Sequence, residues 1–362
     1  MHISRLEVHQ VRNLKQVAID LHSAANVVYG INGSGKTSFL EALHLLGRGK
    51  SFRHRDLRLV INHDASDLIV SAKVERQSPP RTHQLGVKRT RNGHFMARMD
   101  GENLQSAVQL AAIIPLQLID AHSFNLLEGG PLQRRQFLDW GVFHVEPSYT
   151  DLWRRFQKTL KQRNQLLRHG RMDEDSLRIW TAELIPLSEA ITKYRQEYLI
   201  GLADHVAAVA EKFDGLGLLS VEYYRGWRDD CSLSEVMTGD VARDKLVGTT
   251  SHGPQKADLK IKVDGILASD SLSRGQIKLL VYALKLAQAT YYRSKMGESC
   301  LFLLDDLPAE LDHRHRRQVI DCLYDLDCQF FVTGVDKHDF DGLVRENAHK
   351  MFYVEHGAMV AS

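Results

Sequence analysis

The fold is decided by the stretch Gly30-Ile31-Asn32-Gly33-Ser34-Gly35-Lys36-Thr37, which Ser38 follows. It fits the pattern G-x-x-x-x-G-K-[ST], a loop whose glycines let backbone N–H groups approach a polyphosphate. In that pattern the lysine reaches the β- and γ-phosphates, and the hydroxyl of the last residue binds Mg²⁺. Residues 26–29 are typical of a buried strand and residues 38–46 of an amphipathic helix, which is the context that the motif requires. The sequence therefore predicts a nucleoside triphosphate site at residues 30–38, Ser38 included, and the alternative is a glycine-rich turn with an incidental lysine.

The composition sets the broad class of the protein. The chain has 362 residues, of which 43% are hydrophobic and 25% charged, enough for roughly two domains or lobes. Its formal net charge is only +2, so an argument for nucleic-acid binding must rest on local clusters. The cysteines lack metal-binding spacing, the first residues alternate like a strand, and no apolar run approaches the roughly 20 residues of a membrane span. We expect a cytoplasmic protein without a membrane partner.

Basic residues cluster in two places. Residues 48–98 are rich in predicted strands, with a hairpin turn at Asn92-Gly93. Residues 154–171 contain seven basic residues and no acid. Such clusters suit phosphate backbones and give sequence-independent, salt-sensitive binding, and the alternative is a solvated surface. The candidate DNA contacts are Arg53, Arg55, Arg89, Arg91, Arg154 and Arg155.

Residues 146–214 are typical of helices. Two apolar stripes, with spacings that alternate between three and four, predict two antiparallel helices that bury both stripes, as in a coiled coil. We expect the two helices to join near residues 170–175. Pro186 should kink or interrupt the second helix.

Two short segments have an open role. Arg12-Asn13 lies between the first two predicted strands and is either a turn or a nucleotide contact. A helix predicted to begin at residue 131 places Arg134-Arg135 in its first turn, where the helix dipole disfavours cations. These arginines therefore have a phosphate or carboxylate partner, or they are simply solvated.

Two further segments add to the predicted nucleotide site. The apolar strand at residues 300–304 ends in Asp305 and Asp306, which is the Walker B pattern. Asp305 would bind Mg²⁺ and Asp306 would polarise the attacking water. Two carboxylates at the end of a buried strand are costly without a metal or partner, and the alternative is a plain exit into a loop. Ser273 and Gly275 begin a long helix and form either a second anion site or an ordinary cap.

Together these segments resemble the RecF family of bacterial recombinational repair, which belongs to the ABC-type ATPases related to SMC proteins. The likeness covers essentially the whole chain. Thr333 stands where transporters carry a switch histidine, and Asp306 where most ABC ATPases carry glutamate, which suggests slow hydrolysis. Gln255-Lys256 departs from the His-Arg that the family leads us to expect. The segments specific to the family are Gly129-Gly130-Pro131 with Arg134-Arg135, Leu303-Leu304-Asp305-Asp306 with Glu310-Leu311-Asp312, and Gly253-Pro254 with Ala257-Asp258-Leu259.

The resemblance implies an α/β fold: a P-loop ABC-type ATPase head with a mixed β-sheet lobe, and a helical lobe carrying a short coiled-coil-like arm. The ATPase lobe would comprise residues 1–118 and 296–362, and the helical lobe residues 119–295. The implied cofactors are ATP and Mg²⁺. Lys36, Asp305, Asp306 and Ser273 would be the catalytic residues.

The resemblance also implies that two protomers complete one ATP site. Ser273 and Gly275 of one protomer would meet the γ-phosphate bound by the other, with Gln276 beside them. Asp312 would bind the nucleotide from the loop after the Walker B strand. Gln117, in a predicted strand at residues 113–120, is the candidate third Mg²⁺ ligand beside Thr37 and Asp305.

The implied function is that of an ATP-driven DNA clamp. ATP would dimerise the protein on gapped DNA or single-strand/double-strand junctions, RecO and RecR would assist recombinase loading, and weak DNA-dependent ATP hydrolysis would release it. Its processes would be DNA repair, recombination, replication restart and the SOS response to DNA damage. A nucleotide-binding subunit of a membrane transporter is the alternative, opposed by the basic strands and the absent switch histidine. An SMC-type structural protein would need a far longer coiled coil.

Overall fold

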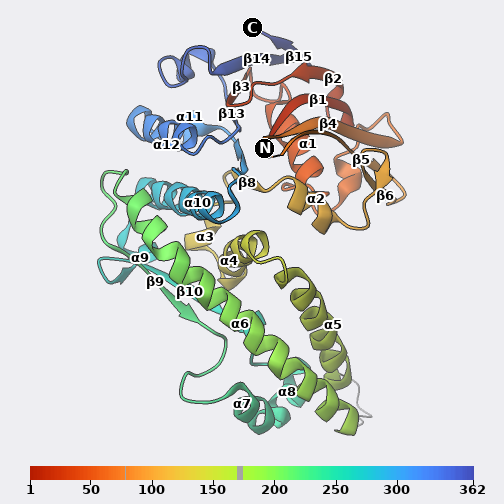
Figure 1. Ribbon diagram of the computed structural model, residues 1–362, viewed down its shortest axis with the longest axis vertical. Helices are drawn as coiled ribbons and strands as arrows, with labels where there is room; N and C mark the ends of the chain where they lie inside the picture. Colours follow the sequence, from red (N-terminus) through yellow and green to blue (C-terminus); the bar gives the residue numbers. More distant parts are fainter. Residues whose placement is uncertain (78, 169–173) are drawn as a thin grey trace. The chain divides into compact units, whose positions relative to one another are not determined.

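The computed structural model describes residues 1–77, 79–168 and 174–362 (Figure 1). The chain packs into two compact units, one made of residues 1–123 and 278–362 and the other of residues 124–277. These bounds differ from the expected lobe boundaries after 118 and 295. The second boundary moves to residue 277 because most of helix α10 (Arg274–Met296) packs in the first unit. No helix in the described part of the chain is both long and apolar enough to span a membrane.

The first unit is built on a six-stranded mixed sheet with the order β15-β14-β3-β13-β12-β8. The strands from β14 to β8 are parallel, and β15 pairs antiparallel to β14 as the closing hairpin. Every residue of β12 is buried, as expected of a central parallel strand covered on both faces. The strands are β3 (Ala25–Tyr29), β8 (Leu116–Ile119), β12 (Leu301–Leu304), β13 (Phe330–Gly334), β14 (His349–Glu355) and β15 (Ala358–Ala361).

A second six-stranded sheet in this unit is antiparallel, with the order β2-β1-β4-β5-β6-β7. The predicted Asn92-Gly93 turn joins β5 to β6, and Gly93 has the positive φ of 92° that such turns need. The strands are β1 (His2–Val11), β2 (Leu14–Asp20), β4 (Asp67–Gln77), β5 (Pro80–Thr90), β6 (Phe95–Met99) and β7 (Glu102–Asn103).

Helix α1 (Lys36–Arg48) shares one hydrophobic core with both sheets. Phe39 and Leu43 of α1 join Val70 from β4 and Phe331 from β13 in that core. The core therefore fixes the helix that follows the glycine-rich loop. The other helices of this unit are η1 (Leu57–Leu59), α2 (Ala107–Ile113), α11 (Leu307–Glu310), α12 (His313–Asp325) and η3 (Lys337–Phe340), with most of α10.

The second unit is mainly helical. It contains the three-stranded antiparallel sheet β11-β10-β9. Its strands are β9 (Leu219–Tyr224), β10 (Asp258–Val263) and β11 (Ile266–Leu267). Its helices are α3 (Asn125–Glu128), α4 (Pro131–Val145), α5 (Tyr149–Arg168), α6 (Glu174–Ala210), α7 (Leu233–Gly239), α8 (Val241–Val247), η2 (Pro254–Lys256) and α9 (Ala268–Ser271).

Helices α5 and α6 form the predicted antiparallel arm and lie side by side in Figure 1. Arg163 in α5 donates to Thr181 Oγ1 at 2.9 Å, while Tyr149, at the start of α5, meets Tyr194 far along α6. The predicted junction near residues 170–175 falls largely outside the described residues. Of the kink or interruption predicted at Pro186, the structure excludes the interruption, because α6 continues through it. Pro186 and Ala182 are exposed, so water can satisfy the carbonyl that loses its helical partner.

Ion pairs and hydrogen bonds of three arginines hold the second unit together. Arg195 is fully buried, donates to both carboxylate oxygens of Asp139 at 2.9 and 3.0 Å, and donates to Pro254 O at 2.8 Å. The sequence left open whether Arg134 has a phosphate or carboxylate partner or is solvated. In the structure Arg134 donates to Asp258 Oδ1 at 2.6 Å and to Oδ2 at 3.1 Å. Arg135 donates to the carbonyl of Ala257 at 2.8 Å. The arginines of the first turn of α4 thus have a carboxylate and a carbonyl as partners and tie the helix to β10.

Candidate nucleotide-binding site

The glycine-rich loop connects β3 to α1, as the sequence predicts. Two of its glycines are required by the backbone. Gly30 has a φ of 151°, and a Cβ there would lie 2.3 Å from Val354 O. Gly35 has a φ of 130°, and its Cβ would lie 3.1 Å from Asn13 Nδ2. Any larger residue at either position would displace neighbouring atoms, so the loop keeps its curvature only with glycine.

The loop curls around the Lys36 ammonium. Lys36 Nζ donates to Gly30 O at 2.7 Å and to Ile31 O at 3.0 Å. Burial lowers the pKa of Lys36, and the carboxylates of Asp306 and Asp305 oppose that shift. Ser34 Oγ is buried and has no hydrogen-bond partner among the described residues. Because no side chain caps the first turn of α1, its N–H groups are available to an anion.

Hydroxyl groups from helix α1 and strand β13 surround Asp305, which follows β12. Asp305 Oδ1 accepts from Thr37 Oγ1 at 3.2 Å and from Thr333 Oγ1 at 2.9 Å. Burial raises the pKa of Asp305, and the two hydroxyl bonds partly oppose this. Asp306 has a left-handed φ of 53°, and its N–H donates to Thr333 Oγ1 at 2.7 Å. Parallel order places the ends of β3, β13 and β12 at one sheet edge, so the predicted loop and Walker B residues meet there.

The cluster fits a nucleotide-bound Mg²⁺ ion better than a metal held by protein alone. Among residues 1–77, 79–168 and 174–362, no group of three or more His, Cys, Asp or Glu could hold a metal ion. Mg²⁺ characteristically uses one or two protein ligands and completes its shell with phosphates and water. Thr37 and Asp305, 3.2 Å apart through their oxygens, match that demand.

The structure does not bring Gln117 to this cluster. Gln117 pairs with Phe302 in the sheet, three residues before Asp305, which corresponds to roughly 10 Å along the strand. Its buried amide donates to Gln288 Oε1 at 3.2 Å. Asp120 instead follows the last residue of β8, Ile119. The backbone N–H of Asp305 donates to Ile119 O, which brings Asp120 beside Asp305. A signal for Asp120 was present in the sequence, because it ends a predicted strand just as Asp305 does.

The side chain of Asn13 forms hydrogen bonds to the phosphate loop and to the first turn of α1. Its Nδ2 donates to Ser34 O at 2.8 Å, and its Oδ1 accepts from Ser38 Oγ at 2.8 Å. Ser38, a predicted nucleotide-binding residue, is buried, and its hydroxyl contacts Asn13. The Arg12-Asn13 segment is thus a turn that also grips the phosphate loop.

Ser273, Gln276 and Asp312 act as helix caps. Gln276 Oε1 accepts from the N–H of Ser273 at 3.0 Å, and the N–H of Gln276 donates to Ser273 Oγ at 3.4 Å, a reciprocal cap at the start of α10. Ser273 and Gly275 are exposed in the second unit. Asp312 caps α12, and the hydrogen bond from the N–H of His315 is the main cause that lowers its pKa.

The chain matches known proteins over almost its full length. Residues 2–359 match the family described as RecF/RecN/SMC N terminal domain. The chain is 46% identical over 359 residues to the DNA replication and repair protein RecF of Pseudomonas entomophila (strain L48), an alignment that covers 99% of this chain and 97% of the relative. The protein of the same name from Pseudomonas aeruginosa (strain LESB58) has the same identity and coverage. This chain belongs to the RecF family.

Solved structures share the ABC-type head fold of the family. The recombination mediator protein RecF with ATP has a TM-score of 0.88 at 24% identity, with 100% of this chain and 97% of that chain covered. The Smc head bound to the C-winged helix domain of ScpA has a TM-score of 0.62 at 13% identity, with 100% and 98% covered. The predicted combination of a mixed-sheet ATPase head with a helical arm is confirmed.

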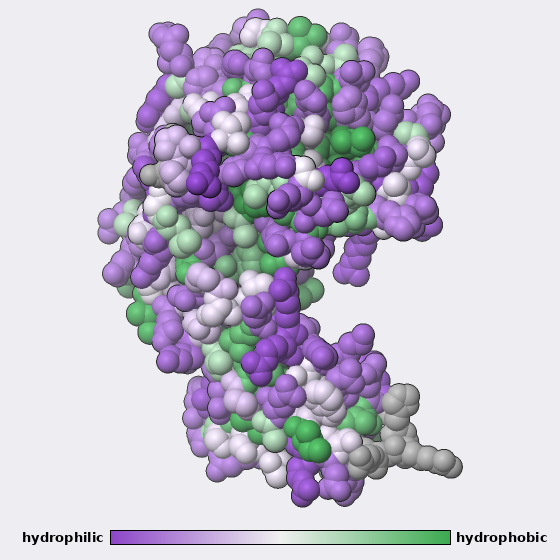
Figure 2. All heavy atoms as spheres, turned by 45° about the vertical axis from the view of Figure 1, so that its right-hand side comes forward, coloured by the Kyte–Doolittle hydropathy of each residue, from purple (hydrophilic) through white to green (hydrophobic). Residues whose placement is uncertain are grey.

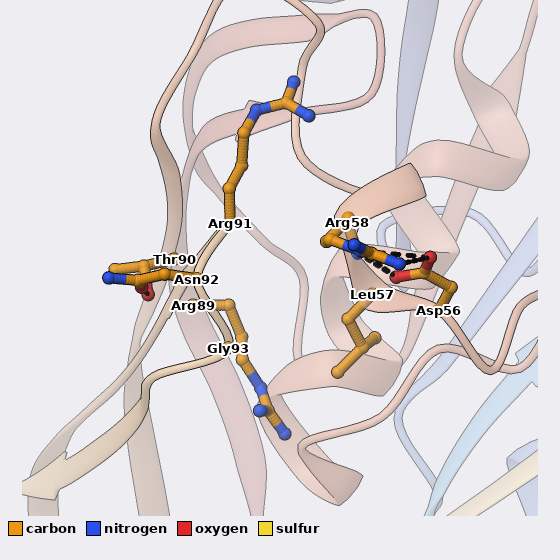
Figure 3. Close-up of a pocket in the computed structure, with 8 residues that line it drawn as sticks. All are labelled: Asp56, Leu57, Arg58, Arg89, Thr90, Arg91, Asn92 and Gly93. Carbon is orange, nitrogen blue, oxygen red and sulfur yellow. Dashed lines mark hydrogen bonds and ion pairs between the residues drawn. The ribbon is translucent and has the colours of Figure 1, made fainter.

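Arg89 and Arg91, two candidate DNA contacts in this RecF-family chain, have their guanidinium groups bound to the protein. They lie with Arg58 and Asp56 around a cavity of about 370 Å³ (Figure 3). Arg89 donates to Gly49 O at 3.1 Å, and Arg91 donates to the carbonyls of Ala65, Asn62 and His63 at 2.7, 2.7 and 3.0 Å. Their side chains extend in opposite directions along the hairpin, and Arg58 pairs with Asp56. They therefore anchor the hairpin to neighbouring loops.

The other four candidate contacts are exposed. Arg53 and Arg55 lie in the turn after α1, and Arg154 and Arg155 lie on α5. Arg154 pairs with the exposed Asp151 at 3.1 Å, a surface pair of small energy. Hydrophilic side chains cover most of the face in Figure 2, and hydrophobic ones form only small separate areas. The exposed basic residues of α5 are Arg154, Arg155, Lys158, Lys161 and Arg168.

Proposed function

We propose that this chain is an ATP-dependent DNA-binding recombination mediator, in which ATP drives dimerisation on DNA and slow hydrolysis releases it. The observation that carries this proposal is the cluster of Thr37, Asp305 and Thr333 beside the Lys36 loop. The cluster occurs in a chain 46% identical to relatives named for DNA replication and repair. A nucleotide site with a complete phosphate loop supports an ATP-dependent version of that role.

The nucleotide would bind by exchanging partners in the loop. Lys36 would leave the carbonyls of Gly30 and Ile31 for the β- and γ-phosphates, and Ser34 Oγ would gain its first partner. Thr37 and Asp305 would hold Mg²⁺, which neutralises phosphate charge when bound. Asp306 would orient the attacking water. A short aspartate in that position, with Thr333 where transporters have histidine, favours slow turnover.

The second anion site would act in a dimer. Ser273, Gly275 and Gln276 of one protomer would meet the γ-phosphate of the other, and Asp312 would contact the same nucleotide. The γ-phosphate would then stabilise the closed dimer by contacts that the diphosphate cannot make. This follows the family likeness, and the exposure of Ser273 and Gly275 is compatible with it.

Exposed arginines would contact the DNA backbone. Arg53 and Arg55 from the first unit, and Arg154 and Arg155 from α5, are the remaining candidates, because Arg89 and Arg91 are engaged with backbone carbonyls. Gapped duplexes or single-strand/double-strand junctions would be the substrates, and RecO and RecR the partners in recombinase loading. Stimulation of ATP hydrolysis by DNA belongs to the same proposal.

The test is the variant Lys36→Ala, with Lys15→Ala on β2 as an exposed-lysine control. Sedimentation with and without ATPγS, and with and without a gapped duplex, reports the oligomeric state. We expect the wild type and Lys15→Ala to dimerise with nucleotide and to be retained on DNA, and Lys36→Ala to lose both. Retention of DNA by Lys36→Ala would exclude the ATP-driven clamp. Failure of the wild type to bind DNA, together with co-purification with a membrane protein, would favour the transporter subunit.

A further inference from the structure

Glu41 on α1 is a buried carboxylate with three hydrogen-bond donors. Its side chain has an exposure of 0%. Arg12 donates from Nε to Oε2 and from Nη2 to Oε1, the second bond at 3.0 Å. Ser51 Oγ donates to the same Oε1. A carboxylate removed from water resists the loss of any donor, because an unsatisfied charge is costly in a low-dielectric interior. Glu41 therefore holds together the segments that supply Arg12 and Ser51, and we call these three hydrogen bonds the Glu41 joint.

One side of this joint reaches the phosphate loop. Arg12 has a left-handed φ of 52°, which a non-glycine residue keeps only when its surroundings fix it. Besides Glu41, Arg12 donates to Leu59 O at 3.3 Å. The next residue, Asn13, bonds to Ser34 O and Ser38 Oγ of the loop and first turn. The position of Asn13 against the loop therefore depends on the Arg12–Glu41 pair.

The other side reaches the turn that carries two exposed arginines. Ser51 Oγ accepts from the N–H groups of Arg53 and His54, each at 3.0 Å. One helical turn after Glu41, the ring of His44 donates to Lys50 O at 2.6 Å. Burial lowers the pKa of His44 to about 4, so it remains a neutral donor near neutral pH. The basic turn at residues 51–55, and Lys50 before it, are thus hydrogen-bonded to α1, the helix that begins at the phosphate loop.

We propose that Glu41 is a positioning residue that couples the phosphate loop to the basic turn at residues 51–55. The inference rests on the proposed function, because it takes Arg53 and Arg55 as contacts to a nucleic-acid phosphate backbone. Nucleotide binding changes the loop that Asn13 grips, and the bonds through Arg12, Glu41 and Ser51 pass this change to the N–H of Arg53. Because such coupling is reciprocal, DNA bound at the turn tightens nucleotide binding by the same factor.

The test is a binding cycle on the full chain with Ser51→Ala, which cuts the joint on the side of the basic turn and leaves the Arg12–Glu41 pair. The dissociation constant of a gapped duplex is measured with and without MgATPγS, and that of ATPγS with and without the duplex. In the wild type we expect nucleotide to tighten DNA binding roughly tenfold. In Ser51→Ala that ratio falls to about twofold or less, while ATPγS affinity without DNA and nucleotide-dependent dimerisation persist.

Two matched variants separate coupling from loss of structure. Ser51→Thr keeps the hydroxyl and restores the wild-type ratio. Ser66→Ala removes an exposed serine from the same unit and leaves the ratio unchanged. As a second measurement, ATPγS increases the hydrogen-exchange protection of the Arg53 and His54 amides in the wild type and has no such effect in Ser51→Ala.

The outcomes distinguish this inference from the proposed function. A wild-type ratio and wild-type protection in Ser51→Ala would overturn the coupling and leave the clamp intact. A wild type whose DNA affinity ignores nucleotide would overturn both.

Discussion

At the scale of single residues, the nucleotide site contains two ionisable side chains whose burial disfavours the charged forms that ligand binding requires. Asp305 lies in a largely buried position where its pKa is raised, and Lys36 lies where burial lowers its pKa. Both shifts disfavour the charged forms that Mg²⁺ and phosphate need. The polyphosphate and its metal would supply the missing opposite charges, so ligand binding relieves a cost that folding leaves in place.

Asp305→Asn should stabilise the protein and abolish MgATP hydrolysis. Because the folded pKa is raised, the folded protein binds the Asp305 proton more tightly than the unfolded chain does. The free energy of unfolding therefore falls as the pH rises through the interval between the ordinary and the raised pKa, and it stays lowered above that interval. We expect the asparagine variant to be about 1 kcal/mol more stable at neutral pH, with no difference below the ordinary pKa of aspartate.

Urea titrations across pH check this expectation, with the exposed Asp64→Asn as the control. The two threonine hydroxyls can still donate to the asparagine oxygen. A variant less stable than the wild type at neutral pH would contradict the argument.

At the scale of elements, the arm is anchored by close packing as well as by buried arginines. Gly141 on α4 faces Tyr198 on α6, and a Cβ at Gly141 would lie 2.0 Å from Tyr198 Oη. Tyr198 is 2% exposed, so its ring cannot swing into solvent without opening the core. The glycine is needed because the two helices approach closely here.

Gly141→Ala should destabilise the protein by about 1–3 kcal/mol through overpacking. In a double-mutant cycle, the same change in a Tyr198→Ala background should cost much less, because the clash is gone. Gly239→Ala, at the end of α7 with no atom within 4 Å of the new Cβ, serves as the control and should be neutral or slightly stabilising. Equal losses in both backgrounds, measured by thermal unfolding, would show that the close approach is not the cause.

At the scale of the whole molecule, DNA binding should be governed by salt. The formal net charge is only +2, so attraction has to come from local groups such as the exposed face of α5. Binding to the phosphate backbone releases counterions, and the logarithm of the binding constant then falls linearly with the logarithm of the salt concentration.

Replacing Arg154 and Arg155 together with alanine should reduce that slope by about 0.9 for each DNA phosphate that the variant no longer neutralises. Binding to a gapped duplex in the presence of ATPγS is measured over a range of salt concentrations. Arg178→Ala, an exposed arginine on α6 paired with Asp175, is the control. An unchanged slope in the double variant would place the DNA on another surface and leave the nucleotide-dependent dimer untouched.

The sequence by itself determined the local parts of this protein. The phosphate loop, the Walker B strand, the Asn92-Gly93 turn and the two-helix arm follow from spacing and periodicity within short segments. The local sequence alone defines two of these motifs. One is the loop with glycines at positions 30 and 35, and the other is the apolar run that ends in two acids. The family likeness added the mixed sheet and the helical unit.

Only the tertiary structure decided which side chains meet. Gln117 and Asp120 lie in one predicted strand, yet pairing register leaves Gln117 in the interior and brings Asp120 to the edge beside Asp305. Arg89 and Arg91 have the same spacing in the sequence as Arg53 and Arg55. Neighbouring segments supply backbone carbonyl partners to Arg89 and Arg91, whereas Arg53 and Arg55 are exposed. Register, burial and partners depend on residues far apart in the chain, and a local pattern contains no information about them.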